Sequence, residues 1–464
     1  MIKTRSGILF YVVTIGVLLG LIFFVLHAGK QLEPSISSTP ADNPVPKQML
    51  PQNAHATLSH PLAVFLMQII IIIIASRLCA YLFQKIGQPA VMGETIAGIL
   101  LGPSLLSTVL PGFSQFVFPA ASLGNLQMLS QIGLILFMFV IGMELDLNVL
   151  KKKAGAAIMI SHASIVIPYG LGVSLAYFIY QRYAPPHIPF YAFSLFMGIA
   201  MSITAFPVLA RIIRERNWQK TRLGTLAITC AAADDITAWC LLAVIVAIAK
   251  AGSLSAALYT ILFAALFILL MFFVVKPFLN KLLSHKTEDK NMQQSTLALV
   301  FVVLLLSSYC SEIIGIHALF GAFLAGVMMP QNWDFRNNLI HKIEDIALVL
   351  LLPLFFVFTG LRTQVGLLNT PELGITCLII IAIAVLGKLG GSALAARFTG
   401  ETPRYSLAIG ALMNTRGLME LVVLNIGYDL GILTVEMFTM MVIMAIATTL
   451  MTAPILNWLK VSGN

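Results

Sequence analysis

The sequence predicts an all-α polytopic membrane protein of about 13–14 transmembrane helices. Of its 464 residues, 59% are hydrophobic and only 10% are charged, and the mean hydropathy is +0.94. Soluble domains contain roughly 25% charged residues. Apolar windows of about 20 residues, long enough to cross the hydrocarbon core, recur along the chain. The net charge of +9 is therefore expected to reflect Lys and Arg kept on the cytoplasmic side rather than nucleic-acid binding.

The first apolar stretch is expected to anchor the N-terminus. It covers residues 7–28, follows Lys3 and Arg5, and lacks a small-residue cleavage site. It is also longer than a signal-peptide core, so residues 1–28 are expected to form an uncleaved transmembrane anchor. Residues 29–60 are polar and contain five prolines, which predicts an exposed linker. The main transmembrane domain is expected over residues 61–460.

Thirteen apolar segments follow the linker, and each is expected to form one helix. They begin near Pro61, Gln88, Asn125, Ala154, Phe190, Arg222, Leu254, Ser295, His317, Lys342, Glu372, Arg404 and Leu433. Threading all fourteen helices from a cytoplasmic N-terminus places 20 Lys and Arg inside and five outside, with three more within helices. A wrong helix count would destroy this asymmetry, so both termini are expected in the cytoplasm.

The helices form two six-helix blocks that enter the membrane from opposite sides. The blocks cover residues 61–250 and 295–460 approximately, and the helix beginning near Leu254 connects them. This arrangement is typical of inverted-repeat transporters, whose ion sites lie near the bilayer midplane where interrupted helices meet.

One helix in each block, at the equivalent position, contains residues that interrupt a helix. The first reads Ser202-Ile-Thr-Ala-Phe-Pro-Val208 and the second Met413-Asn-Thr-Arg-Gly-Leu-Met419. Proline removes a backbone donor, and glycine tolerates unwinding. In lipid, such breaks persist only where protein or a water-filled cavity satisfies the freed groups. We expect two discontinuous helices, broken around Ala205, Phe206 and Pro207 and around Asn414, Thr415, Arg416 and Gly417.

Asp234 and Asp235 lie near the middle of the helix predicted over residues 222–249. An intramembrane acid costs about 2.5–3.5 kcal/mol on insertion scales and usually faces a cavity. Burial and a neighbouring like charge both favour the neutral carboxyl group, so such a pair can hold protons or a cation but not comfortably both. The alternative is a structural pair satisfied by neighbouring hydroxyls such as those of Thr229 and Thr237.

Other charged residues also fall inside predicted helices. Lys388, flanked by Gly387 and Gly390, needs an anion, and the aspartate pair is the obvious candidate; the alternative is that it snorkels to the cytoplasmic interface. Arg416 and Glu420 are four residues apart and can pair locally. Glu94 and Glu312 are expected to have gating, structural or interfacial roles, and Arg77 to support packing or an interface. His317 is expected to be a hydrogen-bonded structural residue, with pH sensing as the alternative.

No signature of an enzyme is present in the sequence. It contains no Walker lysine loop, no GxSxG and no HExxH. A DDxxD metal motif would need a carboxylate at Ala238. The five cysteines lie in apolar segments without CxxC spacing and are expected to be buried small hydrophobes rather than disulfides or metal ligands. We therefore expect no catalytic function and no cofactor.

Seven stretches together resemble the cation:proton antiporter-2 family, and within it the branch of plant cation/proton exchangers and fungal potassium/proton antiporters. They span most of residues 61–460 and are Gln88-Pro89 through Gly93-Glu94 to Leu101-Gly102-Pro103, Gly142-Met-Glu-Leu-Asp146, Ser202-Ile-Thr-Ala-Phe-Pro-Val-Leu-Ala-Arg211, Ala233-Asp-Asp-Ile-Thr-Ala-Trp239, Gly315-Ile-His-Ala-Leu-Phe-Gly-Ala-Phe323, Leu352-Pro-Leu-Phe-Phe356 and Asn414-Thr-Arg-Gly-Leu-Met-Glu-Leu421.

The resemblance implies the sodium/proton-antiporter fold and a homodimer in which a core domain moves against a dimerisation domain. It implies that Asp235 is the essential carboxylate that binds the cation and the proton, and that Lys388 pairs with Asp234. Thr204 and the adjacent backbone would line the site. The combination of two aspartates and a lysine suggests electrogenic exchange. Many relatives carry a large cytosolic regulatory domain, whereas this sequence stops at Asn464, so ligand gating through such a domain is not expected.

The main functional hypothesis is a secondary transporter that exchanges Na⁺ or K⁺ for protons, for pH and cation homeostasis. Its expected partners are monovalent cations, protons and the lipid bilayer, with no nucleic acid, and its expected location is a plasma membrane, the inner membrane of a bacterium. The alternative is a potassium efflux pathway or gated potassium channel on the same scaffold, without coupling to protons. The sequence does not choose between Na⁺ and K⁺.

Overall fold

The computed structural model describes residues 60–144, 154–218, 221–251, 254–284, 294–330 and 332–460. All of them belong to the second of two compact units, Leu58–Asn464. The predicted anchor (1–28), the linker up to residue 59 and the lysine run at 151–153 lie outside the described residues. Every regular element in the described part of the chain is a helix.

The first half of this unit contains the helices before the connector. They are α3 (Pro61–Lys85), α4 (Ala90–Leu101), the short α5 (Leu106–Val109) and α6 (Pro111–Val117), α7 (Ala120–Glu144), α9 (Ala154–Tyr183), α10 (Phe190–Ser202), α11 (Phe206–Glu215) and α12 (Arg222–Ala251). The connector is a continuous helical run of α13 (Leu254–Leu270), the π-helical turn η2 (Met271–Val275) and α14 (Lys276–Ser284).

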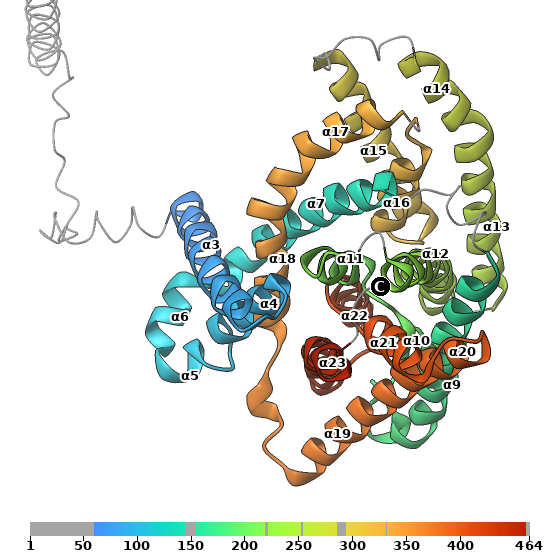
Figure 1. Ribbon diagram of the computed structural model, residues 1–464. Helices are drawn as coiled ribbons and strands as arrows, with labels where there is room; N and C mark the ends of the chain where they lie inside the picture. The colour runs from blue at the N-terminus through green and yellow to red at the C-terminus, as the bar shows by residue number, and fades with distance from the viewer. Residues whose placement is uncertain are drawn as a thin grey trace, which may run out of the picture. The chain divides into compact units, whose positions relative to one another are not determined.

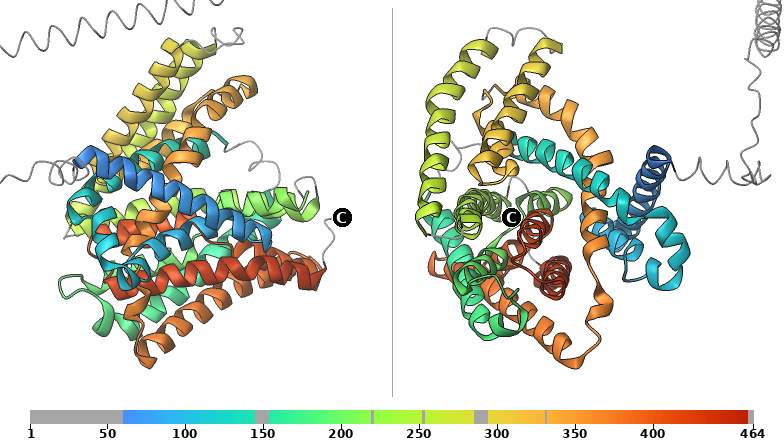
Figure 2. Two further views of the ribbon diagram at one scale, coloured as in Figure 1. Left: turned by 90° about the vertical axis from the view of Figure 1, so that its left-hand side faces the viewer. Right: turned by 180° about the vertical axis from the view of Figure 1, so that it is seen from behind.

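The second half repeats the same succession. It consists of α15 (Gln294–Ile314), α16 (Ala318–Met328), α17 (Trp333–Ile346), the π-helical turn η3 (Ala347–Leu351), α18 (Leu352–Arg362), the 3₁₀ turn η4 (Val365–Leu367), α19 (Pro371–Val385), the π-helical turn η5 (Leu386–Gly390), α20 (Gly391–Phe398), α21 (Pro403–Met413), α22 (Leu418–Asp429) and α23 (Val435–Leu459). In Figure 2 most of the long helices run in roughly one direction, as expected of helices that cross a bilayer.

Membrane-spanning length confirms the predicted series of segments. Among the described residues, ten helical runs are long and apolar enough to cross a membrane, and the bent pair α21–α22 makes eleven. The broken pair α10–α11 and the shorter apolar α16 occupy the two remaining predicted positions. The chain is thus an all-helical, multi-span membrane protein.

Two expectations from the sequence need correction. The helix predicted from Lys342 begins at Trp333. Its first turns are amphipathic: Phe335, Arg336, Leu339 and Ile343 are buried, whereas Asn338, His341 and Lys342 are exposed. A search for apolar windows misses such a pattern. The five cysteines were expected to be buried, but only Cys230 and Cys377 are; Cys79 and Cys310 are half-buried and Cys240 is exposed. A bilayer solvates apolar side chains, so a small apolar residue can face outward there.

The two halves repeat one tight helix crossing. Figure 1 shows α4 beside α18, and α7 crosses α16 in the same way. A Cβ atom on Gly98 of α4 would lie 2.6 Å from the Cα of Val357 in α18, and one on Gly326 of α16 would lie 2.1 Å from the carbonyl oxygen of Phe139 in α7. Both glycines therefore let two helix backbones touch.

The same spacing of small residues produces both crossings. Ala90-Val-Met-Gly-Glu-Thr-Ile-Ala-Gly98 in α4 matches Ala318-Leu-Phe-Gly-Ala-Phe-Leu-Ala-Gly326 in α16 at two alanines and two glycines. The first glycine of each also has an equivalent neighbour, because Gly93 packs on the backbone of Cys79 in α3 and Gly321 on that of Ser307 in α15. This match between the two stretches is visible in the sequence, although the symmetry was inferred there from the order of the helices and from the helix breakers.

Three prolines free backbone carbonyl groups that long polar side chains then satisfy. A proline has no N–H to donate to the carbonyl four residues earlier, and in lipid that carbonyl needs another partner. Below Pro168, Lys388 donates to the carbonyl oxygen of Ser164 at 2.9 Å. Below Pro353, Arg77 donates to that of Val349 at 3.3 Å. Below Pro454, Gln88 donates to that of Leu450 at 3.3 Å.

A matched pair of substitutions in α7 tests the crossing. Gly142→Ala would place a Cβ 2.2 Å from the carbonyl oxygen of Phe323 and should destabilise the fold by roughly 1–3 kcal/mol through overpacking. Gly124→Ala in the same helix meets nothing within 4 Å and should be neutral or slightly stabilising. Thermal unfolding in detergent measures both, and equal midpoints for the two variants would contradict the close contact.

Candidate functional site

The two broken helices meet at their breaks. In the first half, α10 ends at Ser202 and α11 begins at Phe206; in the second, α21 ends at Met413 and α22 begins at Leu418 after a bend of 42°. The N–H of Ala205 donates to the carbonyl oxygen of Thr415 at 3.0 Å, so each break supplies a partner for the other. Figure 1 shows α10, α11, α21 and α22 gathered in one region together with α12.

Threonines of α23 hold the second break. The side-chain amide of Asn414 donates to the carbonyl oxygen of Thr448 at 3.3 Å, and the Arg416 N–H donates to the Thr449 hydroxyl at 3.0 Å. Gly417 has φ +156°, and a Cβ there would lie 2.9 Å from Val208 in α11. A glycine is therefore required where the second break passes over the first.

Two buried cations satisfy the end of α10. The last carbonyls of a helix have no partner within it and carry its negative end. Arg416 donates to the carbonyl oxygens of Ala200, at 2.8 Å, and Met201, and Lys388 donates to that of Ser202. Both side chains come from the second half of the chain and are fully buried.

Arg416 also forms the predicted pair with Glu420. Its Nη1 lies 2.8 Å from Oε2 of Glu420, and both side chains are fully buried. Glu420 stands in the first turn of α22, where an anion interacts favourably with the helix dipole. The charges of Arg416 and Glu420 at the second break therefore compensate each other.

Lys388 reaches the first half of the chain from the π-helical turn η5. Gly387, beside it, packs against Pro168 of α9, where a Cβ atom would lie 3.0 Å from the proline Cα. The ammonium group lies 3.2 Å from Oδ2 of Asp234, and both side chains are fully buried. Lys388 thus lies in the protein interior and does not snorkel to an interface.

Asp234 is surrounded by donors. Ser161 donates to its Oδ1 at 2.6 Å, and Ser164 and Thr204 donate to Oδ2, the latter at 2.7 Å. Together with Lys388 these groups supply donors to both of its oxygens. Thr204, expected from the family resemblance to line the site, therefore directs its hydroxyl to Asp234.

Asp235 has a different environment. It is only 2% exposed, and neither carboxyl oxygen has a regular hydrogen-bond partner in the described part of the chain; the backbone N–H of Phe206, at the start of α11, lies near it without such a bond. The side chain lines a cavity of about 10 Å³, close to the space of one water molecule. Ile203, at the first break, and Met419 and Val423 of α22 form part of its wall.

The alternative explanation from the sequence named the wrong hydroxyls. Thr229 and Thr237 donate to carbonyl oxygens of their own helix, those of Thr225 and Ala233. The serines that do bond Asp234 were not predicted. Ser161 and Ser164 form a polar pair on one face of an apolar helix, three residues apart, which was the available signal.

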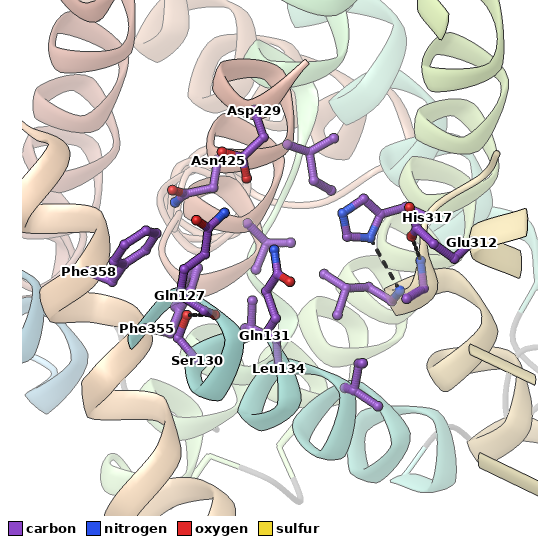
Figure 3. A pocket seen from close by; sticks show the side chains of 15 residues that line it. Gln127, Ser130, Gln131, Leu134, Glu312, His317, Phe355, Phe358, Asn425 and Asp429 are labelled. Carbon is purple, nitrogen blue, oxygen red and sulfur yellow. Dashed lines mark hydrogen bonds between the residues drawn. The ribbon is translucent and has the colours of Figure 1, made fainter. Parts of the chain in front are cut away.

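Two larger cavities lie toward opposite ends of α7, between the broken helices and α7 with α18. One, of about 440 Å³, is bordered by Glu144 and Glu344 and by Val208 of α11. The other, of about 200 Å³, is shown in Figure 3, where Gln127 and Gln131 of α7 face Asn425 and Asp429 of α22. Each therefore approaches the site from a different side.

The other titratable residues singled out in the sequence lie away from the aspartate pair. Glu312 accepts from the N–H of Ala318 at 2.7 Å, and the ring of His317 accepts from that of Leu319 at 3.4 Å, so both cap α16 beside the second cavity. Arg77 bonds the carbonyls of η3 as described above. Glu94 is buried within α4.

The profile of the family described as "Sodium/hydrogen exchanger, transmembrane" matches residues 70–458. The chain belongs to this family. It is 42% identical over 398 residues to the Na⁺/H⁺ antiporter NhaS4 of Synechocystis, with 86% of this chain and 97% of that protein aligned.

Further comparisons support the membership in the sodium/hydrogen exchanger family. Cation/H⁺ antiporter 17 of Arabidopsis thaliana is 40% identical over 401 residues and K⁺/H⁺ antiporter 1 of Saccharomyces cerevisiae 33% over 409 residues, each covering 86% of this chain; the chain spans about half the length of these two. The sodium proton antiporter MjNhaP1 of Methanocaldococcus jannaschii has the same fold, with a TM-score of 0.61 over 86% of this chain and 97% of that one at 14% identity.

Membership settles the class of protein. Sodium/hydrogen exchangers are transporters and not enzymes, and the chain is an integral membrane protein that exchanges a monovalent cation for protons. The resemblance inferred from the seven sequence stretches is thereby confirmed.

Replacing Arg416 tests the charge pairing at the second break. Arg416→Met should destabilise the fold by about 3–5 kcal/mol, because Glu420 and two carbonyls lose their buried partner. Adding Glu420→Gln should restore part of this loss by removing the unpaired charge. Thermal unfolding of both variants and of Glu420→Gln alone measures the coupling; strictly additive effects would contradict the pairing.

Proposed function

We propose that Asp235 is the group that binds the transported cation and protons in turn. One observation carries this proposal: Asp235 is the member of the aspartate pair whose oxygens lack a partner, whereas the oxygens of Asp234 accept from three hydroxyls and Lys388. A buried carboxylate without a partner is costly, and either a proton or a cation removes that cost. Binding of one therefore excludes the other, which is the requirement for exchange.

Asp234 and Lys388 would make the exchange electrogenic. Their pair is buried and neutral overall, and it depends on both partners being charged. If a cation at Asp235 also attracts Asp234, the bond to Lys388 weakens and the lysine can release its proton. More than one proton could then move for each cation. The hydroxyls of Ser161, Ser164 and Thr204 would remain bonded to Asp234 when Lys388 is neutral.

The two larger cavities would supply alternating access. Asp235 lies on α12 beside the broken helices, and the two cavities lie between those helices and α7 with α18. A shift of the broken helices against α7 and α18 would enlarge one cavity at the expense of the other. Na⁺ and K⁺ both remain candidates. A homodimer, cytoplasmic termini and a plasma-membrane location remain part of this proposal.

Asp235→Asn tests the central assignment. Asparagine keeps the size of the side chain but neither titrates nor carries charge, so cation-dependent dissipation of a pH gradient in proteoliposomes should be abolished for Na⁺ and K⁺ alike. Asp345→Asn, which removes an exposed carboxylate on α17, should retain full exchange. Near-normal transport by Asp235→Asn would refute the assignment.

Asp234→Asn tests the electrogenic step separately. The variant should still exchange a cation for a proton while the current per turnover falls toward zero, since the charged pair with Lys388 is gone. Capacitive currents on a solid-supported membrane and pH-dye exchange, measured on the same proteoliposomes, give both quantities. A current per turnover equal to wild type would disprove the role of the pair.

A further inference from the structure

Trp239 lies on α12 one helical turn after Asp235 and shares its cavity. Residues four apart on a helix project from the same face, and both side chains line the space of about 10 Å³. Trp239 is 3% exposed, and its Nε1–H has no hydrogen-bond partner among the residues described. Buried indole N–H groups usually have one.

The unpaired groups around this cavity are complementary. The indole of Trp239 offers one donor, and the oxygens of Asp235 offer acceptors, yet the two do not bond each other. The other side chains of the wall are apolar: Ile203, Ala238, Leu242, Met419 and Val423. Within this wall, Trp239 is therefore the side chain that can orient a small polar guest against Asp235.

The chemistry of the indole limits what that guest can be. Indole Nε1–H is a donor only and has no lone pair for a cation. It can hold the oxygen of a water molecule, whose second lone pair then points to a cation and whose hydrogens can reach a carboxylate. A cavity of about 10 Å³ is just large enough for one water molecule, so its walls must move apart when a cation binds beside that water.

We propose that Trp239 is a positioning residue that fixes one water molecule as a ligand of the cation at Asp235. The inference rests on the proposed role of Asp235 and adds that the cation binds partly hydrated, with a carboxylate oxygen and the Trp239-bound water among its ligands. The cation then keeps one water ligand when it enters the site, so the free-energy cost of dehydrating it is smaller.

Trp239→Phe tests this role, because it keeps an aromatic ring and removes the donor. In proteoliposomes the apparent KM for the transported cation should rise roughly five- to tenfold, equivalent to about 1–1.4 kcal/mol, while the maximal rate stays within about twofold. Trp458→Phe, at an exposed site on α23, should leave both unchanged. An unchanged KM, or losses of rate and thermal stability without a selective rise in KM, would overturn the proposal.

A second measurement reads the Trp239 indole directly in the wild-type protein and does not depend on the transport activity of Trp239→Phe. The chain has four tryptophans, so their ¹⁵N-labelled indole N–H signals can be resolved and that of Trp239 assigned by its absence in Trp239→Phe. Adding Na⁺ or K⁺ should shift this signal in the wild type and not in Asp235→Asn; a signal insensitive to the transported cation overturns the role of Trp239. The function proposed for Asp235 fails separately, only if Asp235→Asn still transports.

Discussion

Backbone groups that a helix cannot pair must find partners inside a medium without water, and this constraint organises the whole site. Two helices break halfway through the membrane, and the last carbonyls of α10 are left without intrahelical partners. Arg416 and Lys388 satisfy these carbonyls, and threonines of α23 satisfy the other break. Prolines in the unbroken helices also leave carbonyl groups without an intrahelical donor, and side chains from other helices bond them.

Because Lys388 and Arg416 bond the carbonyls at the end of α10, the position of these two cations determines which acids are paired. Arg416 takes Glu420 as its counterion, and Lys388 takes Asp234. Since each of these two cations has one carboxylate beside it, Asp235 is left over, at a small cavity and without a regular hydrogen bond in the described part of the chain. The acid that we propose binds the cation is thus the one that the structural pairs leave without a partner.

Sequence patterns predicted the helical series, both breaks and the charged residues near the site, because hydropathy, glycine and proline report local constraints. They could not predict which partner each group takes, since that depends on helices far apart in the sequence. Ser161 and Ser164 carry no charge, so their role as partners of Asp234 was hard to predict. The start of α17 was missed because its first turns are amphipathic rather than uniformly apolar. The hydrogen bonds of Asp234, and their absence at Asp235 among the residues described, depend on tertiary structure and could not be predicted from the sequence.

The division of charge between the halves bears on how such a chain could have arisen. Both aspartates belong to the first half, while Lys388 and Arg416 belong to the second and donate into the first. Two identical copies of the first half would bring four acids together without a base, and two copies of the second would face each other with lysines and no aspartate. A duplicated ancestor could share the glycine crossings that both halves keep, but not this centre. The centre needs two sequences that have diverged from each other within one polypeptide.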